Sequence, residues 1–162
     1  MPKIVVVVMH PMPRVWDALC ERTCELAPFL EHIERAELKS RQTSDDGVTR
    51  CVHAWRARAN VPALLAHHVD KGVLEWTGRT EWRAEVPESR WVVEPKSMKG
   101  AALCEALMRF SAAAGGRGTR VDLELALVGP QRMAGMQMLT NTLLATHFRK
   151  LVDAAAKLIE KR

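Results

Sequence analysis

Three side chains in this sequence could bring acid–base chemistry to one place: His53, Thr80 and His147. His53 lies two positions before Trp55 in an alternating segment, and His147 lies among apolar residues of a helical segment, so both rings could face the interior. Histidine exchanges protons near neutral pH, which makes His53 and His147 the pair to test for catalysis. The alternative is a buried His53 bonded to backbone, because no carboxylate is predicted beside it. We therefore assign no catalytic residue, and the sequence leans against an enzyme.

Two groups of residues could bind a metal ion. Cys20 and Cys24 stand about one helical turn apart, but no second ligand pair follows at the spacing of a zinc finger. That absence favours two small apolar residues on the buried side of a short helix. His67 and His68 are adjacent in an apolar connection, where they could bind a metal, gate a cavity or point into solvent. We expect neither a metal nor a cofactor, and we expect the cysteine thiols to be reduced.

Phosphate and nucleic-acid binding find little support. Residues 115–118, Gly-Gly-Arg-Gly, resemble a phosphate loop only in composition, because they lack the Gly-Lys-Ser/Thr ending and precede no helix. A hairpin turn is the expected structure there. Arg79 and Arg83 alternate with Glu81 and Glu85, so these charges neutralise one another locally. We expect no nucleic-acid partner.

The length of 162 residues suits one domain, which we expect to span residues 1–162. The apolar run 4–9 is too short for a secretory signal or a membrane span, so we expect a cytoplasmic protein. The net charge of +5 is uneven, with +4 in residues 132–162 and +1 in the rest. This basic segment could touch an anionic membrane surface transiently, or it could be the solvated face of a helix. The oligomeric state stays open.

Alternation of apolar and charged residues is clearest in segment 74–85, and it predicts a strand with one face on a core and the other in water. Asp46 and Gly47 together predict a hairpin turn. We expect strands at residues 3–10, 29–42, 48–59, 74–85, 90–94, 104–111 and 120–128.

Two helical segments frame these strands. Pro13 suits the first turn of a short helical stretch that we expect to stop at Pro28. Pro130 suits the start of a second helix over residues 131–161, whose apolar residues recur every three or four positions. A helix of that length reaches about 45 Å. It needs a wide apolar surface to lie on, and the inward faces of the strands supply one.

The order of these elements resembles the Bet v 1-like, START-related superfamily (SRPBCC). The resemblance rests on VVVVMHPMPRVWDAL at the start and NTLLATHFRKLVDAAAKLIE at the close, with TGRTEWRAEV, SRWVVEPK and GTRVDLELAL as successive strands between them. It implies a helix-grip α+β fold, in which an antiparallel sheet of about seven strands curves around a long C-terminal helix. It also implies a cavity for an apolar ligand, since members bind lipids, sterols or polyketides, and some are polyketide cyclases. The superfamily has no shared catalytic motif to carry over.

Large side chains gather on the inward faces of the predicted strands, opposite the long helix. If a ligand binds, we expect it to touch His53, Trp55, Trp76, Thr80, Trp82, Trp91, Met108, Phe110, Leu143, His147 and Leu151. The aromatic residues could line a cavity, or they could fill the core and leave no space for a guest.

Three functions follow as expectations. We favour the binding or transport of a hydrophobic small molecule or lipid in an interior cavity, without catalysis. A polyketide cyclase or dehydratase is the second, and it would need converging acid and base groups, for which only the three residues named first are candidates. A protein-interaction or chaperone-like module is the third, and it would show an exposed apolar patch near Leu64, Leu65 and Val69.

Overall fold

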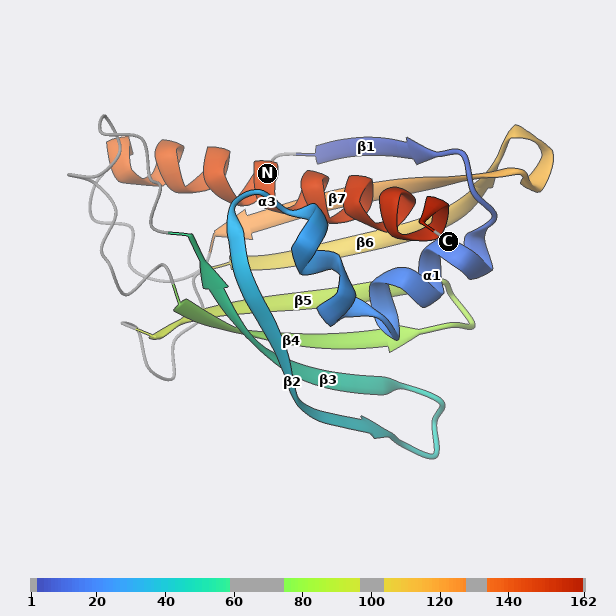
Figure 1. Ribbon diagram of the computed structural model, residues 1–162, viewed down its shortest axis with the longest axis horizontal. Coiled ribbons are helices and arrows are strands. Elements are labelled where there is room, and N and C mark those ends of the chain that lie inside the picture. The colour runs from blue at the N-terminus through green and yellow to red at the C-terminus, as the bar shows by residue number, and fades with distance from the viewer. Residues whose placement is uncertain (1–2, 59–74, 97–103, 128–133, 162) are drawn as a thin grey trace.

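The computed structural model describes residues 3–58, 75–96, 104–127 and 134–161, with the backbone alone for residues 127 and 134–143 (Figure 1). In chain order its elements are β1 (Lys3–Val8), α1 (Met12–Cys20), η1 (Thr23–Phe29), β2 (Ile33–Thr43), β3 (Thr49–Ala57), β4 (Glu75–Arg83), β5 (Glu88–Pro95), β6 (Cys104–Ala113), η4 (Ala114–Gly116), β7 (Gly118–Leu127) and α3 (Ala134–Glu160). The elements labelled η are 3₁₀-helices.

The strands form one antiparallel sheet in the order β1-β7-β6-β5-β4-β3-β2, so β1 and β2 are its edges. Side chains alternate between its two faces, as the pleat requires. On β3, for example, Cys51, His53 and Trp55 are buried, whereas the residues between them are half-buried. The inward face of the sheet is mainly apolar and aromatic, and the outer face is largely polar but carries the exposed Val5 and Val7 on β1.

The long helix α3 lies along the inward face of the curved sheet, and α1 packs against it near its C-terminal end (Figure 1). Its buried stripe consists of Phe148, Leu151, Val152, Ala155 and Leu158. Spacings of three and four residues place these side chains on one side of the helix. The helix-grip α+β fold predicted from the sequence is confirmed, including the short helical stretch after the first strand.

Some predicted boundaries were wrong. The helical stretch predicted to stop at Pro28 is two elements, because α1 ends at Cys20 and the 3₁₀-helix η1 then runs from Thr23 to Phe29, one residue past the proline. The strand predicted at residues 90–94 is longer, Glu88–Pro95, because β4 and β6 pair with it on both sides. Several residues named from the sequence lie outside the described part: Leu64, Leu65, His67, His68, Val69 and Leu74.

The β2–β3 hairpin turns at Gly47, as the sequence predicted. Gly47 has φ of +80°, a left-handed conformation that glycine adopts without steric cost. Beside it, Asp46 Oδ1 accepts hydrogen bonds from the Ser44 hydroxyl at 2.7 Å and from the Val48 amide at 3.1 Å. The carboxylate thus ties the two sides of the turn together.

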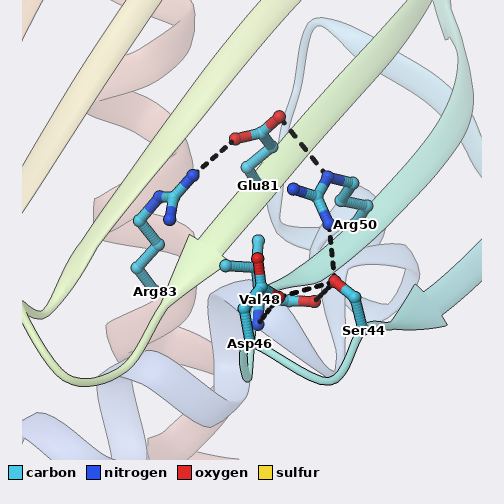
Figure 2. A network of polar contacts seen from close by, with 6 residues as sticks. All are labelled: Ser44, Asp46, Val48, Arg50, Glu81 and Arg83. Carbon is cyan, nitrogen blue, oxygen red and sulfur yellow. Dashed lines mark hydrogen bonds and ion pairs between the residues drawn. The ribbon is translucent and has the colours of Figure 1, made fainter.

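Charged side chains join this turn to β4 (Figure 2). Arg50 donates to the Ser44 hydroxyl at 2.7 Å and forms an ion pair with Glu81 at 3.6 Å. Arg83 reaches the same Glu81 carboxylate at 3.4 Å. Of the alternating charges noted in the sequence, Arg83 pairs with Glu81, whereas Arg79 pairs with Glu94 of β5 at 3.1 Å.

Replacing Gly47 with alanine is expected to destabilise the protein by about 1 kcal/mol. A Cβ added at Gly47 would meet no atom within 4 Å, so the cost is backbone strain alone. Chemical denaturation of G47A measures it, with D45A, an exposed change in the same turn, as the control. Equal stability of G47A and the parent protein would contradict the strained turn.

Candidate ligand-binding interior

The predicted ligand-binding residues whose side chains are described share the interior between the sheet and α3. His53 and Trp55 come from β3, Trp76, Thr80 and Trp82 from β4, Trp91 from β5, Met108 and Phe110 from β6, and His147 and Leu151 from α3. All are buried except Trp76, which is half-buried. Leu143 belongs to α3, but its side chain lies outside the described part.

One end of this interior, beside α1, is filled with aromatic rings. Trp16 of α1 packs edge-on against Trp82 and Phe110, with ring centroids 5.1 and 5.2 Å apart. Trp91 packs against the other side of Trp82 at 5.6 Å. T-shaped contacts of this kind are favourable arrangements for aromatic rings. This end therefore has the packing of a core.

The other end of the aromatic row has a different arrangement, built around His147. The Trp55 and Trp76 rings are nearly parallel, 7° apart in orientation, with centroids separated by 6.2 Å. The His147 ring stands almost perpendicular to both, at 5.6 Å from Trp55 and 5.4 Å from Trp76. Phe148 follows on α3 and links this group to Trp91 at 5.6 Å. Two flat apolar surfaces thus meet one polar ring.

The hydrogen-bond partner of His147 is a residue that the sequence did not single out. His32, in the turn between η1 and β2, places its Nε2 2.8 Å from Nδ1 of His147. The contact joins residues 115 positions apart, so no local pattern could have indicated it. The sequence feature that could have indicated an inward His32 is its place between Leu30 and Ile33, both of which are core residues.

Burial keeps the histidines of the interior neutral. It lowers the pKa of His147 to about 3 and that of His32 to about 4, from the ordinary 6.5, and each is lowered further by a neighbour: His32 acts on His147, and Lys150 acts on His32. Burial also lowers the pKa of His53. Within the described residues no hydrogen bond joins His53 to His147, nor either of them to a carboxylate. The interior therefore offers neutral hydrogen-bonding groups rather than a charged acid and base.

Two polar atoms of the interior are buried without a hydrogen-bond partner in the described part of the chain. They are the Thr80 hydroxyl oxygen and Nδ1 of His32. Burial without a partner costs free energy, and a bound molecule with a polar group can remove that cost. By contrast, the Ser89 hydroxyl accepts a hydrogen bond of 2.8 Å from the Trp91 indole.

Burial keeps the four cysteine thiols in their protonated form. Burial raises the pKa of Cys20, Cys24 and Cys51, and it raises the pKa of Cys104 to about 12. Among the described residues, no group of three or more His, Cys, Asp or Glu side chains is placed to hold a metal ion. Cys20 is buried at the end of α1, and Cys24 is half-buried in η1.

A groove of about 440 Å³ lies over β2 to β5, lined mainly by charged residues and also by Trp55, Trp76 and Pro95. Its charges pair across it, with Lys96 at 3.1 Å and Arg56 at 3.8 Å from the Glu75 carboxylate, and Lys39 at 3.0 Å from Glu37. These side chains are largely exposed, so water competes for each pair. The groove is a balanced ion-pair surface and lacks the excess of one charge that would select an ionic ligand.

Solved structures resemble the chain over nearly its whole length. The di-domain ARO/CYC StfQ from the steffimycin biosynthetic pathway aligns with a TM-score of 0.60 and 20% identity, over 99% of this chain and 45% of that one. TTHA0849 from Thermus thermophilus aligns with a TM-score of 0.64 and 18% identity, over 97% and 94% of the two chains. For Ara h 8.0201 the TM-score is 0.59 and the identity 10%, over 99% and 97%. No protein-family model and no curated protein sequence matches the chain.

These similarities define the class of fold. The chain has the helix-grip fold shared by Bet v 1-like (SRPBCC) proteins, as the sequence resemblance implied. It spans less than half of the di-domain StfQ chain. Among the described helices, none has the length and apolar character needed to cross a bilayer.

Proposed function

We propose that the protein binds a hydrophobic small molecule or lipid between its sheet and α3, at the end of the interior where Trp55, Trp76 and His147 meet. The observation that carries this proposal is the half-buried Trp76, whose ring lies parallel to the buried Trp55 and perpendicular to His147. An apolar ring beside a few polar atoms is typical of small-molecule sites. The fold is also that of proteins that bind hydrophobic ligands.

The aromatic packing favours the His147 end over the α1 end as the ligand position. Around Trp82 and Phe110, Trp16 already supplies the partner ring. Trp76, by contrast, is only half-buried. The eleven ligand-contacting residues predicted from the sequence, Leu143 included, stay a proposal. Within this set we propose that Trp55, Trp76, Thr80 and His147 lie nearest to the ligand.

Replacing Trp76 with alanine is expected to weaken ligand binding about tenfold. The ligand would first be identified by native mass spectrometry of the purified protein, and its affinity then measured by equilibrium dialysis. The control is V86A, which removes an exposed apolar side chain in the β4–β5 turn. If W76A binds as tightly as the parent protein, the ligand does not lie at this end.

Catalysis of a cyclase type is a second candidate. The bonded pair of His32 and His147 is the observation in its favour, and StfQ and BexL, two of the structurally similar proteins, are described as ARO/CYC. A carrier returns its ligand chemically unchanged, whereas an enzyme releases a product. Chromatography with mass and ultraviolet detection, after incubation with a polyketide-like substrate, separates the two functions. A cyclised product has a new retention time and spectrum even where its mass is unchanged, and a dehydrated product also loses the mass of one water.

A further inference from the structure

The pair formed by His32 and His147 behaves as one hydrogen-bonding unit. The two rings are 84° apart in orientation, and a bond of 2.8 Å joins Nε2 of His32 to Nδ1 of His147. A neutral imidazole carries one donor and one acceptor nitrogen. The proton in the shared bond therefore determines the character of both outer nitrogens.

The shared hydrogen bond can run in either of two directions, because either histidine can be its donor. If His32 donates, its Nδ1 is an acceptor and Nε2 of His147 is a donor. If His147 donates, its Nε2 is an acceptor and Nδ1 of His32 is a donor. In both cases the pair presents one donor and one acceptor at its two ends. Exchanging these roles moves the shared proton from one ring to the other, and it also releases a proton from one outer nitrogen and adds a proton to the other.

Both ends of the pair lack a hydrogen-bond partner among the described residues. Nδ1 of His32 is buried, and Nε2 of His147 makes no hydrogen bond to the described part of the chain. His147 itself is 7% exposed and stands against Trp55 and Trp76. Buried polar atoms in proteins nearly always have partners. Nδ1 of His32 is the atom of the pair that is buried without one among the described residues, and a polar group on a bound ligand would supply it.

The surroundings set the chemistry of that partner. The rings of Trp55, Trp76 and Phe148 pack against His147 and make its environment apolar. A carboxylate or phosphate would leave water for a site whose two rings are neutral, which is unfavourable. Lys150, the positive charge that lowers the pKa of His32, is exposed, so water screens its attraction for an anion. A hydroxyl or a ketone has no such penalty, and the pair can donate to either or accept from a hydroxyl.

We propose that the pair of His32 and His147 is the polar anchor of the interior, and that it selects apolar ligands carrying one neutral hydroxyl or ketone group over ligands carrying a carboxylate. The proposal rests on the proposed function, since it names the ligand class of the same interior. It adds His32 to that site, where the residue acts through His147 or on the ligand directly.

Three probes with one scaffold test this selection: naphthalene, 2-naphthol and 2-naphthoate, each measured by equilibrium dialysis. The quantity of interest is the ratio of the naphthalene Kd to the 2-naphthol Kd, because a shared scaffold cancels the apolar contribution. We expect this ratio to fall about five- to tenfold in H147F and in H32F, since each removes the hydrogen bond but keeps an apolar ring. We expect 2-naphthoate to bind the parent protein more weakly than 2-naphthol.

The matched control is H10Q. His10 also bonds to α3, through Glu160 at 3.1 Å, but on the surface and at the C-terminal end of the helix, away from His147. The ratio should be unchanged in this variant. Since the variants could fail to fold, a second measurement uses NMR of the parent protein. Adding 2-naphthol should shift the imidazole ¹⁵N resonances of His32 and His147. Adding naphthalene should shift them far less.

The possible failures are distinguishable. If naphthalene binds but the ratio is the same in the parent protein and in both phenylalanine variants, the anchor is wrong and the apolar site stands. Equal affinity for 2-naphthoate and 2-naphthol, or histidine resonances that do not respond to 2-naphthol, also overturns the anchor. If none of the probes binds, the proposed function fails together with it.

Discussion

Lowering the pH from about 6.5 to about 4.5 is expected to weaken the fold by roughly 2 to 3 kcal/mol for each histidine of the pair formed by His32 and His147. The folded-state pKa values of about 4 and about 3 lie below the ordinary 6.5. On unfolding, both rings enter water and regain their ordinary pKa, so the unfolded state binds more protons in this range. The stabilisation is therefore complete above pH 6.5 and is lost as the pH falls toward 4 and 3.

Charges near the pair act on His32 in opposite directions. Lys150 lowers the pKa of His32 and Glu31 raises it, both with smaller effects than burial. Denaturant titrations at several pH values measure the dependence of the free energy of unfolding on pH. The H147F variant should show a shallower slope between pH 6.5 and 4.5 than the parent protein. A flat profile in the parent protein would contradict the burial of neutral histidines.

Replacing Gly78 with valine is expected to destabilise the protein by about 3 kcal/mol and to disturb the candidate site. Gly78 of β4 lies opposite His53 in the pairing with β3, and a Cβ there would meet Nε1 of Trp55 at 2.9 Å and Cδ1 at 3.3 Å. Trp55 is 3% exposed and is held between Trp76 and His147, so its ring has little room to move. The missing side chain of Gly78 is what lets the Trp55 indole lie over the sheet.

The matched control for G78V is T77V, at the adjacent position of β4 whose side chain points to the outer face. It introduces the same side chain into the same strand without approaching Trp55. Thermal unfolding and tryptophan fluorescence give the two readouts. Normal stability of G78V would mean that Trp55 does not pack against the backbone of β4 as described.

Much of the fold could be predicted because its signals are local. Alternation in β4 and β7 and the stripe of α3 follow from the periods of strands and helices. The segment that becomes β2 lacks this alternation, and its strand pairing gives the reason. Its pairing with β3 shifts register between Ile33 and Arg35 and again between Leu38 and Ser40, and each irregularity moves the following side chains to the other face.

The candidate site could be predicted only in part. Trp55, Trp76 and His147 lie in elements with clear periodicity, so their inward direction follows from the pattern. The contact between His32 and His147 depends on how the turn before β2 meets α3, which no periodicity reports. The same holds for Trp16, whose contacts with Trp82 and Phe110 depend on how α1 packs on the sheet.

The order of strands in the sheet has a consequence for the folding reaction. The strands that are first and last in the chain pair directly, with Lys3 opposite Glu124, so this pairing must close a loop of more than a hundred residues. Closing such loops costs entropy before any contact compensates for it. The hairpins of β2 with β3 and of β6 with β7 close short loops and can form early. We therefore expect folding in milliseconds to seconds, with the docking of β1 among its last steps.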